Sequence, residues 1–117
     1  MTSPDGRMEV VKSYYIEIRM GSPVFGGFSI RGTDMDTSGR FGEAMAFSCD
    51  SRYLAMEELI SVDPGPHAQA VIFDLEQKRK LVVYDQNPGF VRGFRWLPDG
   101  TLTFRTWSLS DGEIDRT

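Results

Sequence analysis

Cysteine and histidine are almost absent from this sequence, in which Cys49 and His67 are the only residues of their types. A single cysteine cannot form a disulfide within the chain, so folding must depend on packing, as it does in a reducing compartment. Because free cysteine is usually a buried residue, we expect Cys49 to be at least half-buried. One histidine leaves few ways to combine a nucleophile with a base, and we expect no catalytic residues.

Long apolar runs and an excess of basic residues are missing as well. No segment approaches the roughly 20 apolar residues that span a bilayer, and the sequence does not start with a basic segment followed by an apolar one. We therefore expect a cytoplasmic protein that does not bind a membrane. The net charge of −4 disfavours nucleic acid as a partner, because phosphate binding needs a basic surface.

Alternating apolar and polar residues dominate what is present. The 117 residues are 40% hydrophobic and 26% charged, which is typical of one soluble domain spanning 1–117. The alternation predicts an all-β fold, with a turn at 21–23 and a frayed tail at 111–117. We expect about eight antiparallel strands, at residues 8–20, 24–31, 43–49, 52–61, 70–75, 81–84, 90–97 and 101–108.

The segment 52–61 is ambiguous between helix and strand. Leu54, Met56 and Leu59 are good helix formers, and Ser51 could cap a helix that begins there. Segments that follow similar turns elsewhere in the sequence have strand-like patterns. We therefore predict a strand at 52–61.

One short phrase occurs three times: Ser-Pro-Asp-Gly at 3–6, Ser-Cys-Asp-Ser at 48–51 and Leu-Pro-Asp-Gly at 97–100. In such a phrase proline sets the first backbone angle, aspartate bonds to the local backbone, and glycine adopts a left-handed angle. We predict a turn between antiparallel strands at each place. The three aspartates are 45 and 49 residues apart, a spacing typical of stacked supersecondary units.

The residues around the second and third turns resemble blades of a β-propeller of the WD40-like kind. The segments that carry the resemblance are 46–55, 71–75 and 94–100, although Phe73-Asp74 and Tyr84-Asp85 stand where that family has Trp-Asp. The resemblance implies blade-like repeats at about 5–49 and 50–98, followed by a final strand at 101–108. A propeller needs at least four blades. We therefore expect two small packed sheets, either sandwich-like or a part-propeller that another chain completes.

Acidic residues gather between residues 31 and 60, and such a cluster attracts basic ligands. We expect a non-catalytic protein-binding module with a basic protein partner, for example an immunity or antitoxin-type protein that neutralises a basic toxin. Trp107 is out of phase with Phe104 and is expected to face outward. The predicted partner-binding residues are Asp34, Asp36, Glu43, Glu57, Glu58 and Trp107.

Two other function classes stay open. The loop at 34–39 resembles the first half of an EF-hand calcium loop but lacks the closing glutamate, so we expect no metal or cofactor. A small-molecule or metal-binding enzyme would use Asp34 and Asp36 of this loop together with His67 and Cys49. A self-assembling structural unit, in which open blades complete one another, is the third possibility.

Overall fold

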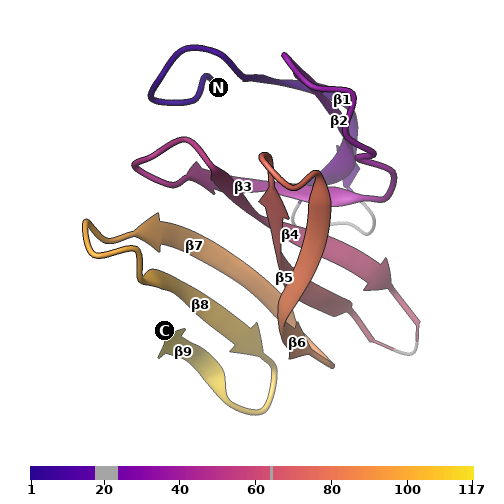
Figure 1. Cartoon of the computed structure of the whole chain (residues 1–117). Helices are drawn as coiled ribbons and strands as arrows, with labels where there is room; N and C mark the ends of the chain where they lie inside the picture. The colour runs from indigo at the N-terminus through magenta and orange to yellow at the C-terminus, as the bar shows by residue number, and fades with distance from the viewer. Residues whose placement is uncertain (18–23, 64) are drawn as a thin grey trace.

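The computed structural model describes residues 1–17, 24–63 and 65–117, which form nine strands and no helix (Figure 1). The predicted turn at 21–23 and the end of the first predicted strand, 18–20, lie outside the described residues. All pairings are antiparallel and fall into two sheets, which confirms the all-β fold class. The strands are β1 (Glu9–Glu17), β2 (Val24–Arg31), β3 (Phe41–Phe47), β4 (Tyr53–Ser61), β5 (His67–Asp74), β6 (Arg79–Gln86), β7 (Phe90–Trp96), β8 (Leu102–Ser108) and β9 (Gly112–Arg116).

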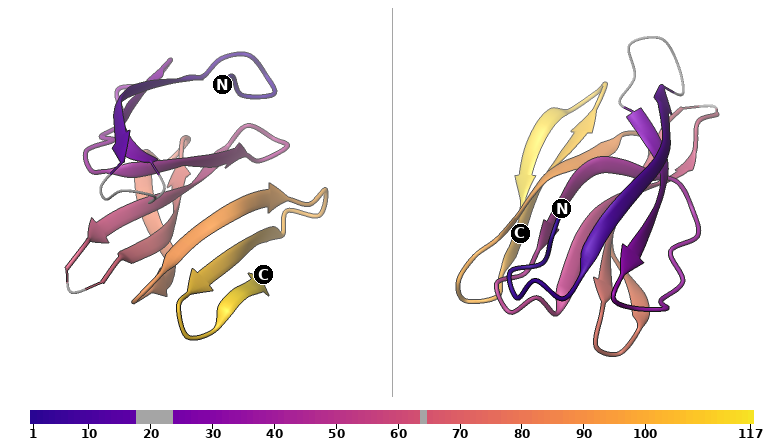
Figure 2. Two further views of the ribbon diagram at one scale, coloured as in Figure 1. Left: turned by 180° about the vertical axis from the view of Figure 1, so that it is seen from behind. Right: turned by 90° about the horizontal axis from the view of Figure 1, so that it is seen from above.

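The strands are arranged in three layers. Strands β1 to β6 follow one another in one sheet, and β7 to β9 form a second. The larger sheet folds over between β2 and β3, which are joined by two residue pairs, Phe25 with Gly42 and Gly26 with Phe41. As a result the β1–β2 hairpin, strands β3–β6 and the β7–β9 sheet lie one above another (Figures 1 and 2). None of the described residues belongs to a helix with the length and apolar character needed to cross a membrane.

The middle layer is buried on both faces. On one face of β5, Phe73 packs edge to face against Phe28 of the β1–β2 hairpin, with ring centroids 5.5 Å apart. On the other face Ala70 packs against Val91 and Phe104 of the β7–β9 sheet. Alternate residues of β5 therefore contribute to two separate cores, because successive side chains of a strand point to opposite faces.

β4 is the strand whose sequence also fitted a helix. Its residues 54–59 are all buried, because layers cover it on both sides. A strand covered on both faces has a continuous apolar run instead of an alternating one, so periodicity alone cannot separate it from a buried helix. The predicted strand at 52–61 is confirmed.

The outer faces of the two end layers are polar. On the β1–β2 hairpin the cross-strand residues Glu9 and Arg31 form an ion pair of 3.0 Å. On the β7–β9 sheet Arg105 and Asp115 form a similar pair of 3.1 Å. Polar outer faces are typical of end units in stacked repeats.

The C-terminal segment is a strand and not the expected frayed tail. β9 pairs with β8 from Gly112, opposite Ser108, to Arg116, opposite Phe104. Gly112 has φ of 69°, and this left-handed conformation closes the β8–β9 hairpin. The expectation of fraying was wrong because β9 is short and contains a single large apolar residue, Ile114, which gives almost no alternation signal.

Candidate functional site

The three repeated phrases form three turns of the same construction, as predicted. In each, the fourth residue donates its backbone N–H to the carbonyl oxygen of the first, over 2.9, 3.0 and 2.9 Å. The aspartate Oδ1 then accepts the N–H two residues further on, over 3.0, 3.1 and 2.9 Å. The fourth residues all have positive φ: Gly6 (75°), Ser51 (64°) and Gly100 (91°).

The three turns lie side by side at one end of the layered structure (Figures 1 and 2). The first contacts the second through a hydrogen bond from the Asp5 N–H to the Ser51 hydroxyl (2.9 Å). The second and third enclose a pocket of about 280 Å³. Beside this pocket Tyr53 stacks on Trp96, with ring centroids 5.8 Å apart. Each layer therefore contributes one turn to a common surface.

Ser51 occupies the position that glycine has in the other two turns. Its left-handed backbone is strained for a residue with a side chain, but its hydroxyl accepts the hydrogen bond from Asp5. We expect Ser51→Ala, which keeps the strain and loses the bond, to lower the free energy of unfolding by about 1–2 kcal/mol. Ser51→Gly also loses the bond but relieves the strain, and we expect it to be nearly neutral. Urea unfolding of both variants tests this, and equal losses would contradict it.

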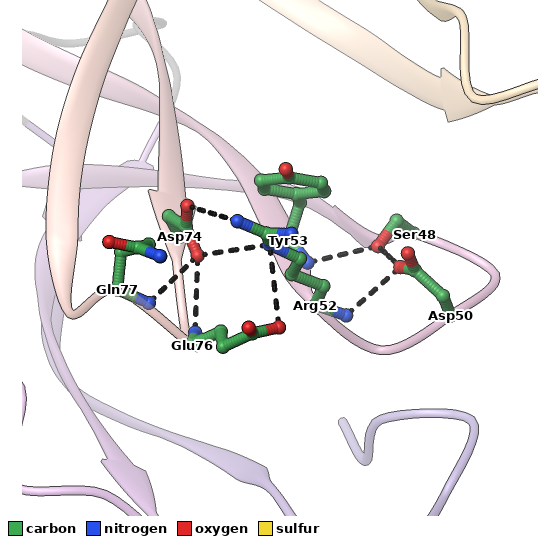
Figure 3. A network of polar contacts seen from close by, with 7 residues as sticks. All are labelled: Ser48, Asp50, Arg52, Tyr53, Asp74, Glu76 and Gln77. Carbon is green, nitrogen blue, oxygen red and sulfur yellow. Dashed lines mark hydrogen bonds and ion pairs between the residues drawn. The ribbon is translucent and has the colours of Figure 1, made fainter.

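A second polar network joins the start of β4 to the end of β5 (Figure 3). The Arg52 guanidinium donates to both carboxylate oxygens of Asp74, over 3.3 and 3.2 Å. Asp74 is 1% exposed and also accepts the backbone N–H groups of Glu76 and Gln77. Burial raises the pKa of Asp74, but the hydrogen bonds from Arg52 and from the backbone outweigh it, so this pKa is lowered overall. The network fixes the β5–β6 turn.

Glu57, a predicted partner contact, is buried between two layers. It is 3% exposed, and its Oε2 accepts the backbone N–H of Val91 over 2.7 Å. Gly42 leaves the room that the carboxyl group needs, since a Cβ at that position would lie 2.6 Å from Oε1. Burial raises the pKa of Glu57 to about 7, against the weaker opposite effects of the Val91 hydrogen bond and of Arg92. Glu57 therefore joins β4 to β7 and does not lie on an exposed acidic surface.

Two more acidic residues are paired with the basic β5–β6 hairpin. Glu58 is 7% exposed and accepts hydrogen bonds from Lys80 (2.9 and 3.1 Å) and from Gln69 (2.8 Å). Asp34 pairs with Lys78 over 2.7 Å. Two acidic residues of the segment 31–60 therefore pair with lysines of the β5–β6 hairpin, which lie far away in the sequence. Glu58 is not part of an exposed acidic surface.

The other predicted contacts have exposed or partly exposed side chains. Asp36 is exposed and accepts the Ser38 N–H (2.9 Å). Glu43 is exposed and lies 3.7 Å from Lys12. Trp107 is half-buried and stacks on Phe90, with ring centroids 5.9 Å apart. Of the six predicted residues, Asp34, Asp36 and Glu43 are therefore exposed carboxylates, and Asp34 and Glu43 have lysine partners within the chain.

The residues of the enzyme alternative are not brought together. Cys49 lies in the turn before β4, beside Tyr53, which is paired with Asp74 at the end of β5. His67 is the first residue of β5, roughly 20 Å from that end at about 3.3 Å per residue, and its ring contacts Asp85. Cys49 is exposed, so the expectation that it would be at least half-buried was wrong. A nucleophile and base made of these two residues is excluded by this distance.

Acidic residues of the 34–39 loop do not gather as metal ligands. Asp34 is engaged by Lys78, and Asp36 binds the backbone of its own loop. Across residues 1–17, 24–63 and 65–117 there is no group of three or more His, Cys, Asp or Glu side chains that could hold a metal ion.

The edge strand β6 has a feature that the sequence analysis did not single out. β6 pairs with β5 and is the last strand of its sheet. Leu81, Val82 and Val83 are 37%, 54% and 44% exposed. Three consecutive exposed apolar residues on a sheet edge are unusual unless they are functional. The sequence signal is an apolar run at 81–84 that follows a charged hairpin.

A scan of protein-family models, a search of curated proteins and a search of solved structures each found no match to this chain. The resemblance to propeller blades therefore stays a prediction.

Proposed function

We propose that this protein is a non-catalytic protein-binding module that pairs with an extended segment of a partner protein along the free edge of β6. The observation that carries the proposal is the exposure of Leu81, Val82 and Val83 on an edge strand. An edge strand offers unpaired backbone N–H and C=O groups to an incoming strand, and apolar side chains add buried area. β1 is the other edge strand of this sheet, but Ile16 (63% exposed) is the one large apolar residue among its described side chains that is exposed, whereas β6 has three such residues in a row.

The acidic loop lies beside this edge and supports a partner with a basic residue. Asp34 contacts Lys78 at the hairpin that leads into β6, and Asp36 lines a pocket of about 160 Å³ with Lys78, Arg79 and Lys80. A basic partner could compete for these carboxylates while its backbone pairs with β6. An immunity or antitoxin-type protein that masks a basic toxin is one version of this proposal. The exposed free thiol of Cys49 suits the cytoplasm, where thiols stay reduced.

Replacing Val82 tests the proposal. We expect Val82→Lys to weaken partner capture from native cell extract at least about tenfold, because a lysine on an edge strand disfavours pairing and removes the apolar contact that Val82 offers to the added strand. Ile60→Lys is the matched control, since Ile60 is 41% exposed but lies on an interior strand. Equal capture by both variants would contradict the proposal. A dimer in light scattering that Val82→Lys dissociates would instead support self-assembly through β6.

A further inference from the structure

The outer face of the β7–β9 sheet concentrates arginines around one groove. A groove of about 520 Å³ is lined by Gly93, Arg95, Thr103, Arg105, Asp115 and Arg116. This volume lies in the range of small-molecule sites. Arg95 and Arg105 come from neighbouring strands, and Asp115 pairs with Arg105. Arg116 follows on β9 and is engaged on the other face of the sheet, where its guanidinium lies 5.0 Å from the centroid of the Tyr84 ring.

The strand register places like charges opposite one another beside this groove. Arg92 on β7 is the cross-strand partner of Arg105 on β8, an arrangement that is destabilising without a compensating anion. Asp115 compensates Arg105 with an ion pair of 3.1 Å. Among the described residues no carboxylate lies within ion-pair distance of Arg95. The groove therefore keeps an excess of positive charge.

The geometry of the groove suits a phosphate group. Gly93 has φ of 71° and lies beneath the Arg105 side chain, where an added Cβ would be 3.7 Å from Cγ and Cδ of Arg105. Guanidinium groups bind phosphate oxygens through two parallel hydrogen bonds, which a lysine cannot do.

We infer that this groove binds a small molecule through its phosphate group, a property separate from partner binding at β6. Arg95 and Arg105 hold the phosphate oxygens. The source of the phosphate, inorganic or organic, is distinguished by the probes below.

Calorimetric titration at constant ionic strength, with sodium pyrophosphate, phenyl phosphate and citrate as separate probes, tests the inference. We expect one saturable site for pyrophosphate or phenyl phosphate, with citrate at least about tenfold weaker. A preference for phenyl phosphate would indicate an organic phosphate, and a preference for pyrophosphate an inorganic one. Tighter binding of citrate would overturn the phosphate assignment.

Matched variants separate a built site from general charge attraction. We expect Arg95→Gln and Arg105→Gln each to weaken phosphate binding about tenfold, and Arg95→Lys to weaken it less. Arg31→Gln is the control, because Arg31 also forms a cross-strand ion pair on an outer face, in the opposite end layer. Equal loss in Arg31→Gln, or no saturation by about 10 mM probe, would overturn the inference. Unchanged thermal unfolding of each variant shows that the fold is intact.

Discussion

Replacing Glu57 with glutamine is expected to make the protein progressively more stable than the wild type as the pH rises, with the difference growing by about 3 kcal/mol between pH 4 and pH 8. Burial raises the pKa of Glu57 from 4.5 in the unfolded chain to about 7 in the fold. The unfolded chain therefore releases this proton at a lower pH than the folded one does. The contribution of Glu57 to the free energy of unfolding is therefore largest below pH 4.5, and it is lost as the pH rises to about 7.

Glutamine keeps the oxygen that accepts the Val91 N–H but cannot ionise, so it removes this pH dependence. Urea unfolding of both proteins at several pH values measures the difference. The pKa values of Asp5, Asp50 and Asp99 are lowered in the fold, so these residues make both proteins less stable as the pH falls below about 4. This loss is the same in both proteins and cancels in the difference between them. A constant difference across the pH range would show that Glu57 is not buried as a neutral acid.

Asp74→Ala is expected to lower the free energy of unfolding by about 3 kcal/mol. The change leaves the Arg52 guanidinium without its main partner and removes the acceptor for two backbone N–H groups of the β5–β6 turn. Arg52 is partly exposed, with its side chain 33% accessible, which limits the penalty for its unpaired charge.

Asp74→Asn is the matched control for this network. Its amide oxygen can still accept the two turn N–H groups, while the charge opposite Arg52 is lost. We expect a loss of about 1 kcal/mol, clearly smaller than that of the alanine variant. Thermal or urea unfolding measures both. Equal losses would indicate that the ion pair with Arg52, and not the turn, accounts for the stability at this position.

Local patterns in the sequence predict the strands and the three turns well. The turn phrases act over a few residues, so Pro-Asp-Gly at 98–100 specifies its hydrogen bonds without help from the rest of the fold. The strand at 52–61 was predicted by analogy with the residues after the other turns, because burial on both faces removes the alternation that marks an ordinary strand.

The surface was much harder to predict than the strands. Glu57 and Glu58 looked like exposed acidic residues, but their partners Val91 and Lys80 lie 34 and 22 residues away in the sequence. The apolar run at 81–84 predicted a strand but not its exposure, because a sequence does not show which strand becomes the edge of a sheet. Tertiary pairing thus decides which charges and which apolar residues remain exposed.

Amide hydrogen exchange, followed residue by residue with and without the captured partner, tests the central claim most directly. The claim is that β6 receives an additional strand. We expect the β6 amides that point away from β5 to exchange quickly in the free protein and slowly in the complex, since those N–H groups of an edge strand have no neighbour until a strand is added. Partner-induced protection confined to other strands, with β6 unchanged, would contradict it.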